Sequence, residues 1–528
     1  MSDCTTRGVD RRSLLRGVGA LGAVTTLTGG LAACGGPAST AGGAGRGASA
    51  IEAGISYALS TGFDPMLASG ATPVAANMHI FEGLVDLDPV DMTSRPALAT
   101  DMPRRVDATT YRATLRKGAT FHDGSPVTSE DVVFSFERIL DPASASLFAQ
   151  FLPFIDEVRS VDERTVEFSL GYEFPLFPSR ICVAKIVPKK LVEADSKGFD
   201  AKPVGSGPYR LTRALRQDKI VMTKYEDYNG PHPARADNLV WRLMVDPSAR
   251  VSAMYSGRIQ AIEDVPYVDV KGLGKKAEIE SVSTFGLLFM MFNCARQPFD
   301  DKRVRQALHY ALDTEKVIGT ALLGNGNAAT GYLQEAHADY HRAATVYRHD
   351  PDRARELLAE AGVENLRIEI LTTDTGWVKD SAPVIKESLD AVGLRTTLNI
   401  AQSAAQYSKV DKGDYDVLIA PGDPSVFGND VDLLLRWYYE GVWPEKRFRW
   451  KDSPQDRKVR SLLDEAARSD EEKHRRKLWA QVTDLIADEV PLYPILHREL
   501  PTAWDDEALD GFQPLPMTGL SFLGVGRA

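Results

Sequence analysis

The pattern of apolar and polar positions predicts strands and helices intermixed along the chain. Apolar residues alternate with polar ones within 111–115 and again within 166–170. Successive side chains of a strand point to opposite faces, so this period of two predicts two half-buried strands. Helical patterns occur between and after them, and such mixing favours an α/β or α+β architecture.

Three segments have both a helical period and defined ends. Segment 128–140 starts with Thr128, which can cap the first turn, and has Asp131 at the reciprocal capping position. Segment 350–361 starts with an Asp-Pro pair and is followed by glycine, as helix starts and ends prefer. A third helix is predicted over 470–489, closely followed by a proline. We expect these helices to be scaffold.

The first 33 residues have the three parts of an export signal: a basic start, an uncharged stretch and a small-residue end. The paired Arg11-Arg12 resembles a twin-arginine signal, although ordinary secretion signals also contain adjacent arginines. Leu-Ala-Ala before Cys34 resembles a lipoprotein cleavage box, in which Cys34 receives the lipid. We therefore expect an export signal at 1–33, then a lipidated cysteine and flexible Gly/Ala/Ser-rich tether at 34–50. The mature protein would lie outside the cytoplasm, anchored to the cell membrane.

Composition describes an acidic globular protein. The chain has 528 residues, of which 43% are hydrophobic and 26% charged. At roughly 150 residues per domain, this length predicts about three structural units. A net charge of −11 argues against a nucleic-acid partner, because phosphate recognition needs clustered Lys and Arg. Cys182 and Cys294 are the cysteines beyond the signal, and they form either a disulfide or two buried thiols.

The sequence lacks the common enzyme motifs. It contains no GxSxG elbow, no phosphate loop, no HExxH and no paired CxxC. His337 and His341 have the four-residue spacing of a metal-binding helix, but the adjacent Glu is missing and the region reads as a solvated loop. We expect no cofactor and no metal. A hydrolase that uses two carboxylates remains open on sequence alone.

Several blocks resemble one protein family. FHDGSPVTSEDVVFSFERIL, within residues 95–140, is similar to the signature region of the oligopeptide/dipeptide/nickel-type solute-binding proteins of ABC importers (family 5, cluster C type). Further similar blocks follow the family's order: 62–88, VGSGPYRL at 204–211, 292–313, HDPDRARELLAEAG, and PLYPI at 491–495. Each block is weak alone, but six in the correct order are specific.

The resemblance implies an α/β fold of the periplasmic-binding-protein type, a two-lobed clamshell with an extra inserted sub-domain and hence three sub-domains. The parts it implies are lobe 1 at 51–95, 204–284 and 491–528, the inserted sub-domain at 96–203, and lobe 2 at 285–490. It also implies a monomeric receptor, not an enzyme, that binds a peptide or other small polar solute and delivers it to ABC permease transmembrane subunits. Non-peptide solutes such as a nickel complex or a sugar, a sensory receptor without transport, and a structural lipoprotein remain alternatives.

Two loops become candidate ligand contacts through the resemblance. Relatives line their cleft with a loop after the first strand, which here contains Gly62, Phe63 and Asp64; the alternative is a turn with a packed aromatic. Peptide-binding relatives place an aspartate after a lobe 2 strand to pair with the ligand's amine. Asp423, after the predicted strand 417–420, is the candidate here.

Alternatives to Asp423 remain within the same stretch. A gapless comparison places Ser425 near that position, while Asp430 and Asp432 resemble helix-capping acids, and Asp423 before a proline also suits a turn. Phe427 is a further candidate ligand contact.

One departure from the family affects the expected ligand. Dipeptide binders use an arginine before the helix predicted at 381–392 to hold the ligand carboxylate, and this sequence has none there. Thr375 and Trp377 are the candidate contacts in its place, with Lys379 as a possible charge. A strict dipeptide ligand is therefore in doubt, and longer peptides or another polar solute stay open.

Overall fold

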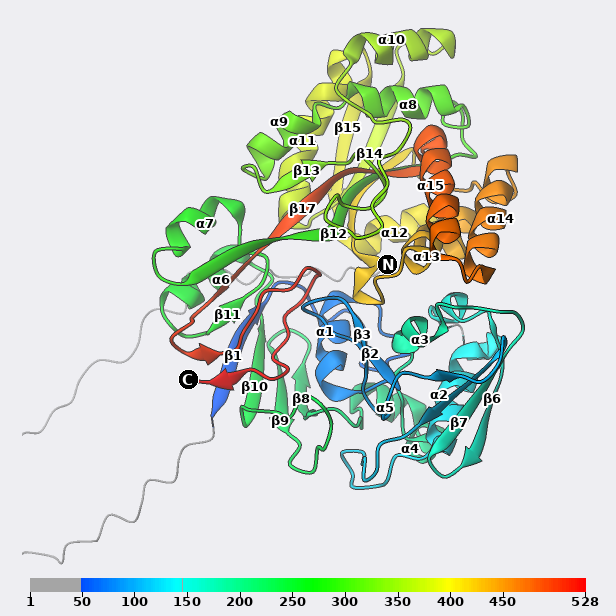
Figure 1. Cartoon of the computed structure of the whole chain (residues 1–528). Helices are drawn as coiled ribbons and strands as arrows, with labels where there is room; N and C mark the ends of the chain where they lie inside the picture. The colour runs from blue at the N-terminus through cyan, green and yellow to red at the C-terminus, as the bar shows by residue number, and fades with distance from the viewer. Residues whose placement is uncertain (1–48, 145) are drawn as a thin grey trace, which may run out of the picture. The chain divides into compact units, whose positions relative to one another are not determined.

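An 11-stranded mixed sheet runs through both lobes of the computed structural model, which describes residues 49–144 and 146–528 (Figure 1). The export signal, Cys34 and nearly all of the tether lie outside the described residues. The strand order is β15-β14-β16-β12-β17-β11-β1-β10-β9-β8, and β13 pairs with β17 beside this path. The strands are β1 Ala50–Ile55, β8 Tyr209–Leu215, β9 Lys219–Lys224, β10 Asn238–Leu243, β11 Ala261–Ile262, β12 Glu278–Phe292, β13 Gly326–Ala328, β14 Arg367–Thr373, β15 Arg395–Ala401, β16 Val417–Gly422 and β17 Leu492–Trp504.

Two long antiparallel strands carry the sheet from one lobe to the other. In Figure 1, β12 (green) and β17 (red) run together from the region of β11 to that of β14. Their register shifts between Ser283 and Leu287 and again between Leu288 and Phe289, and beyond the first break β12 also pairs with β16. The predicted start of lobe 2, at residue 285, falls within this break.

Each lobe contains a set of parallel strands. In lobe 1, β1 is parallel to β10 and β11; in lobe 2, β14 is parallel to β15 and β16. Parallel neighbours need a crossover connection, here α11 (Gly376–Ala391) between β14 and β15 and α12 (Ser403–Lys412) between β15 and β16.

The inserted segment forms a second sheet, and the predicted elements within it are confirmed. Its order is β4 (Arg104–Arg105), β5 (Thr110–Thr114), β7 (Thr165–Leu170) and β6 (Ile155–Asp162). The predicted strands 111–115 and 166–170 correspond to β5 and β7, which pair with each other. Helix α2 (Ser129–Leu140) has the predicted capping box, in which the Thr128 amide donates to Asp131 over 3.0 Å.

The other two predicted helices also form. Helix α10 (Pro351–Glu360) begins after Asp350, whose carboxylate accepts a hydrogen bond from the Arg353 amide over 2.9 Å. Helix α15 (Glu472–Glu489) begins two residues later than predicted and packs against α14 (Pro454–Arg468).

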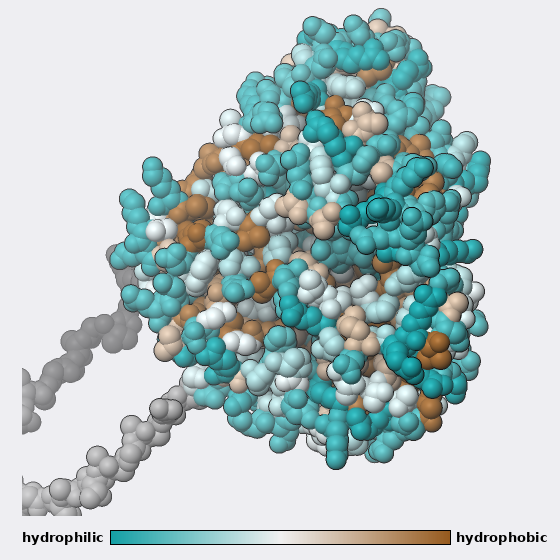
Figure 2. Space-filling model, viewed as in Figure 1, coloured by the Kyte–Doolittle hydropathy of each residue, from teal (hydrophilic) through white to brown (hydrophobic). Residues whose placement is uncertain are grey.

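The viewed face of the molecule is mostly hydrophilic with scattered hydrophobic residues, as the acidic composition leads one to expect (Figure 2). No helix in the described part of the chain is both long and apolar enough to span a membrane.

A buried ion pair joins the inserted sub-domain to lobe 2. Arg180, at the end of α3 (Phe177–Arg180), is 1% exposed and donates to Asp430 over 2.9 Å and to Asp432 over 2.8 Å. Asp430 caps α13 (Val431–Tyr439), and Asp432 lies in its first turn. Asp432 also accepts from Arg436 over 2.9 Å, so each buried charge has a partner. We call this set the Arg180 contact.

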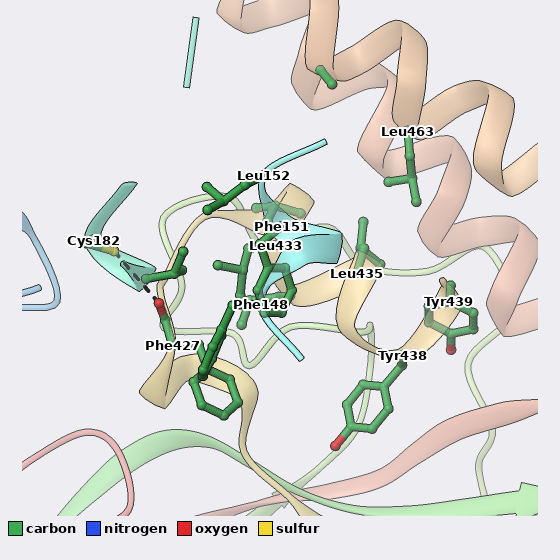
Figure 3. Packing of buried hydrophobic residues seen from close by; sticks show 14 of the residues in the cluster. Phe148, Phe151, Leu152, Cys182, Phe427, Leu433, Leu435, Tyr438, Tyr439 and Leu463 are labelled. Atoms are coloured by element: carbon green, nitrogen blue, oxygen red, sulfur yellow. Dashed lines mark hydrogen bonds between the residues drawn. The ribbon is translucent and has the colours of Figure 1, made fainter. Parts of the chain in front are cut away.

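Aromatic packing accompanies the Arg180 contact. Phe148 of the inserted sub-domain lies edge-on to Phe427 of lobe 2, with ring centroids 5.3 Å apart (Figure 3). The Cys182 thiol lies 3.7 Å from the Phe427 carbonyl oxygen, to which it donates. The described structure therefore has its lobes in contact on this side of the cleft.

Both cysteines of the folded part are free thiols, the second of the two alternatives left by the sequence. Cys182 donates to the Phe427 carbonyl, and Cys294 donates to the carbonyl of Phe292. Burial raises the pKa of the Cys182 thiol to about 12 and that of Cys294 to about 11. Both are therefore protonated and poorly reactive near neutral pH.

A buried histidine ties the C-terminal segment to lobe 1. His79, on α1 (Ala71–Ile80), accepts a hydrogen bond at Nε2 from the Phe522 amide over 2.9 Å. Because Nε2 accepts, Nδ1 carries the proton and donates to the Ala75 carbonyl over 3.0 Å. The ring is neutral, and burial lowers its pKa to about 4.

Lowering the pH from 7 to 5 is expected to reduce the free energy of unfolding by about 2 kcal/mol through His79. The unfolded chain binds a proton near the ordinary histidine pKa, whereas folded His79 stays neutral to about pH 4. This stabilisation is therefore present above about pH 6.5 and lost as the pH falls. Urea unfolding of the wild type and His79→Gln at several pH values measures it, because glutamine can keep both hydrogen bonds without titrating. His232→Gln is the control; equal pH slopes for wild type and His79→Gln would contradict the assignment.

Replacing Arg180 by Met is expected to expose Cys182. Loss of one partner leaves buried carboxylates uncompensated, a cost of about 3–5 kcal/mol while the lobes stay in contact. In a chain whose other cysteines are changed to serine, labelling of Cys182 by an uncharged maleimide should accelerate at least about tenfold. Arg159→Met is the control, because Arg159 pairs with Glu167 at the surface of the same sub-domain. Unchanged labelling in Arg180→Met would show that the Arg180 contact does not hold the lobes together.

Candidate ligand-binding site

The carboxyl ends of the parallel strands in both lobes meet around one polar cluster. Tyr57 follows β1 and Asp264 follows β11, both in lobe 1. Trp377 follows β14 and Asp423 follows β16, both in lobe 2. Ligands of open parallel sheets bind outside these ends, where loops diverge and backbone groups are free. The topology therefore places the candidate site here, between the lobes.

Arg498 of β17 lies in this cluster. Its side chain is 4% exposed, and Nη1 donates to Asp264 Oδ1 over 2.6 Å. The guanidinium carbon lies 4.8 Å from the centre of the Trp377 ring, which makes a cation–π contact between β17 and lobe 2. Asp264 and Trp377 thus hold one cation from the two sides of the cleft.

Tyr57 provides a neutral hydroxyl beside these charges. Burial, followed by the negative charge of Asp264, raises its pKa, while Arg498 acts in the opposite direction. The Tyr57 hydroxyl therefore keeps its proton at neutral pH and can donate a hydrogen bond. Next to it, Glu263 accepts from the Ser56 amide over 3.0 Å, and burial raises the pKa of Glu263.

Asp423 directly follows β16, and its carboxylate already has protein donors. Oδ2 accepts from the Thr518 amide over 2.9 Å and from the Thr518 hydroxyl over 3.0 Å. Oδ1 accepts from the hydroxyl of Ser425, the residue that the gapless comparison favoured. Since Thr518 belongs to the C-terminal segment of lobe 1, Asp423 links the lobes here. Its role as amine anchor stays a prediction.

The acidic alternatives have other partners. Asp430 accepts from the Leu433 amide over 2.9 Å, the helix-capping contact that the sequence suggested. Asp432 is fully buried between Arg180 and Arg436. Both belong to the Arg180 contact.

Phe427 borders a small apolar cavity between the lobes. Met78, Leu87 and Cys182 line it from one side, and Phe427 from the other, with Met517 of the C-terminal segment. Its volume is about 60 Å³, enough for one or two waters or a small side-chain group. Drug-sized ligands occupy about 300–1,000 Å³, so a larger solute needs the lobes further apart than here.

The loop after β1 forms a packed turn in the described structure. Asp64 is fully buried and accepts from Arg138 Nη1 over 2.9 Å. Phe63 packs in the lobe 1 core, and Gly62 lies against the carboxylate of Asp200, where a Cβ atom would collide. Ligand contact through these three residues stays a prediction.

Of the predicted lobe 2 contacts after β14, Trp377 lies in the cluster. Thr375 is the N-cap residue of α11, and its hydroxyl accepts from that of Thr373 over 3.2 Å. Trp377 contacts Arg498, as described above. Sequence reasoning missed Tyr57, Arg498 and Thr518. A charged residue inside the apolar segment PLYPILHREL was the available signal for Arg498.

The histidine pair has ordinary partners. The ring of His337 bonds to the Asn429 carbonyl over 3.1 Å, and that of His341 to the Asp484 carboxylate over 3.0 Å. Among residues 49–144 and 146–528, no group of three or more His, Cys, Asp or Glu side chains is arranged to hold a metal ion.

Comparison with known proteins identifies the family. Residues 93–444 match the bacterial extracellular solute-binding proteins, family 5 Middle. The chain is 26% identical over 473 residues to the glutathione-binding protein GsiB of Escherichia coli K12, covering 88% of this chain and 91% of GsiB.

Solved structures share the fold. The binding protein AgaA of A. tumefaciens R10, in complex with agropinic acid, is 27% identical with a TM-score of 0.81, covering 91% of this chain and 99% of AgaA. A dipeptide-binding protein from Pseudoalteromonas sp. SM9913, in complex with Met-Leu, is 20% identical with a TM-score of 0.80, covering 91% of this chain and 100% of that one. With the family match covering more than half of its length, the chain belongs to the family 5 solute-binding proteins of ABC importers and has their two-lobed α/β clamshell fold.

Proposed function

We propose that this protein captures a peptide or peptide-like solute between its two lobes and delivers it to the membrane permease of an ABC importer. The supporting observation is the convergence of Tyr57, Arg498, Trp377 and Asp423 at the strand ends of both lobes. The glutathione-binding and dipeptide-binding relatives favour peptide-like ligands. The function requires capture and release, so we expect no turnover of the ligand.

Closure of the lobes would provide the signal to the permease. A ligand favours closure only by the difference between its affinities for the closed and the open arrangement. Contacts from both lobes supply such a difference, because an open cleft leaves one set unmade. We place the hinge at the register break between β12 and β17, at the boundary between lobe 1 and lobe 2.

Location outside the cytoplasm accords with the family. We propose twin-arginine export and a lipid on Cys34 from the pattern of the first 34 residues, which lie outside the described part. The tether after Cys34 would then let a monomeric receptor reach the permease from the membrane surface.

A non-peptide polar solute is the second candidate. The segment before α11 has no arginine, and the relative at 27% identity was solved with agropinic acid. A sensory receptor without transport would use the same cleft and differs in the partner that it contacts.

A thermal-shift screen of the whole protein tests the proposal. Peptides of two to eight residues, glutathione, nickel–histidine, single amino acids and sugars are the probes. A ligand that binds the folded state alone should stabilise it by about 2.7 kcal/mol at a hundredfold excess over its Kd. We expect the largest shift with a peptide, and its loss in Asp423→Ala if Asp423 also accepts the ligand's amine.

The possible outcomes separate the parts of the proposal. A peptide shift that survives in Asp423→Ala keeps the ligand class and removes the amine anchor. Asp227→Ala, at an exposed position, should behave as wild type. A shift with a non-peptide solute alone contradicts the peptide class, and no shift with any probe contradicts solute capture.

A further inference from the structure

Arg498 is a little-exposed cation with few hydrogen-bond partners in the described structure. A guanidinium group has five N–H donors, and buried donors are nearly always paired. Within the described residues, the hydrogen bond from the Arg498 side chain runs to Asp264 alone. Its other polar neighbour is the hydroxyl of Tyr267, which itself donates to the Glu499 carbonyl over 2.9 Å. Donors on the guanidinium therefore remain for another acceptor.

Two other arginines of similar burial have more hydrogen-bond partners. Arg180 donates to two carboxylates and to the Phe151 carbonyl. Arg305, 2% exposed, donates through Nε, Nη1 and Nη2 to the backbone or side chain of Glu489 and to two further carbonyls. Such arginines are structural. Arg498 differs from them in lying between the lobes with few partners.

The geometry leaves the edge of the guanidinium for a ligand. Trp377 covers its face at 4.8 Å, and Asp264 holds Nη1 at 2.6 Å. These two contacts hold the group in place, and a carboxylate binds a guanidinium in its plane through two parallel hydrogen bonds. Because Asp264 belongs to lobe 1 and Trp377 to lobe 2, the arginine is oriented fully only when the lobes approach.

The surroundings of Trp377 add donors rather than acceptors. Helix α11 has 16 residues, Thr375 at its N-cap makes no side-chain capping bond, and its first turn contains no acid. The indole N–H of Trp377 is buried without an acceptor in the described part of the chain. There is open space beside Gly376, where a side chain would otherwise project. A helix N-terminus of this kind favours a negative group.

Acidic neighbours do not remove this preference. Asp264 compensates one positive charge but occupies one nitrogen of Arg498. Asp423 is satisfied by Thr518 and Ser425, and Glu263 is bonded to the Ser56 amide. The donors without partners are thus those around Arg498 and the start of α11.

We infer that Arg498 binds a carboxylate group of the captured solute in the plane of its guanidinium, so that the ligands of this receptor are carboxylic acids. The inference rests on the proposed solute capture and assigns its specificity. The cation comes from β17, across the cleft from the segment before α11.

Paired probes test the inference in the full-length protein. Trialanine and N-acetylated trialanine are each compared with their C-terminal amides by isothermal titration calorimetry. The acids should bind at least about tenfold more tightly than the amides, as expected for a charged hydrogen-bonded pair. Arg498→Gln should weaken the acids by about tenfold to a hundredfold and leave the amides nearly unchanged, so that the preference disappears.

Two further variants distinguish loss of the Arg498–carboxylate contact from misfolding of the protein. Arg498→Lys keeps the charge beside Asp264 but not the planar fork, and should retain part of the preference. Arg447→Gln is the matched control, because Arg447 also stacks on a tryptophan, Trp443, at 4.2 Å, and pairs with Asp411 near the C-terminal end of α12. It should keep the wild-type preference.

Opposite results overturn the assignment without touching solute capture. Equal binding of acids and amides by the wild type shows that the protein does not recognise the carboxylate of the ligand. An acid preference that persists in Arg498→Gln assigns it to another group. Binding of sugars or amides in place of every acid retains the receptor and rejects carboxylic acids as its ligands.

Discussion

Strands β12 and β17 carry the sheet from lobe 1 into lobe 2, and their pairing is interrupted around residues 284–286. Thr284 bridges the interruption: its hydroxyl donates to the Arg498 carbonyl over 3.0 Å and accepts from the Gly286 amide over 3.0 Å. A buried backbone group without a partner would cost free energy, and this side chain supplies the partners where the regular pairing fails. The break can therefore exist inside a buried sheet, and it fixes the backbone position of Arg498.

Contacts between the lobes differ in chemistry. Trp377 covers Arg498, Asp423 accepts from Thr518, and Arg180 enters lobe 2 between two aspartates. Only the last is a buried multi-charge pair, and desolvation offsets much of its attraction. The net preference for closure is consequently small compared with the gross interactions, which is what a ligand-responsive equilibrium requires.

Local structure could be predicted from the sequence because its signals are local. The capping box of α2 and the Asp-Pro start of α10 depend on residues within one turn, and both form as expected. The place of Asp423 also followed from a strand and the residue after it. Its partner did not, because Thr518 lies almost a hundred positions further along the chain with no motif around it. Tyr57 and Arg498 were missed for the same reason: their partners come from distant strands.

Specificity in such a cleft depends on which donors and acceptors the protein leaves unpaired. Asp430 and Asp432 were alternatives to Asp423 that more resembled helix-capping acids, and both pair with Arg180 in the Arg180 contact. A satisfied charge gains little from a ligand, because a new bond replaces an existing one. Arg498 is in the opposite situation: it is buried and held in place, but donors of its guanidinium have no protein acceptor in the described part. A ligand acceptor there adds a charged hydrogen bond without breaking one, so this position contributes more to selectivity than the more numerous acids around it.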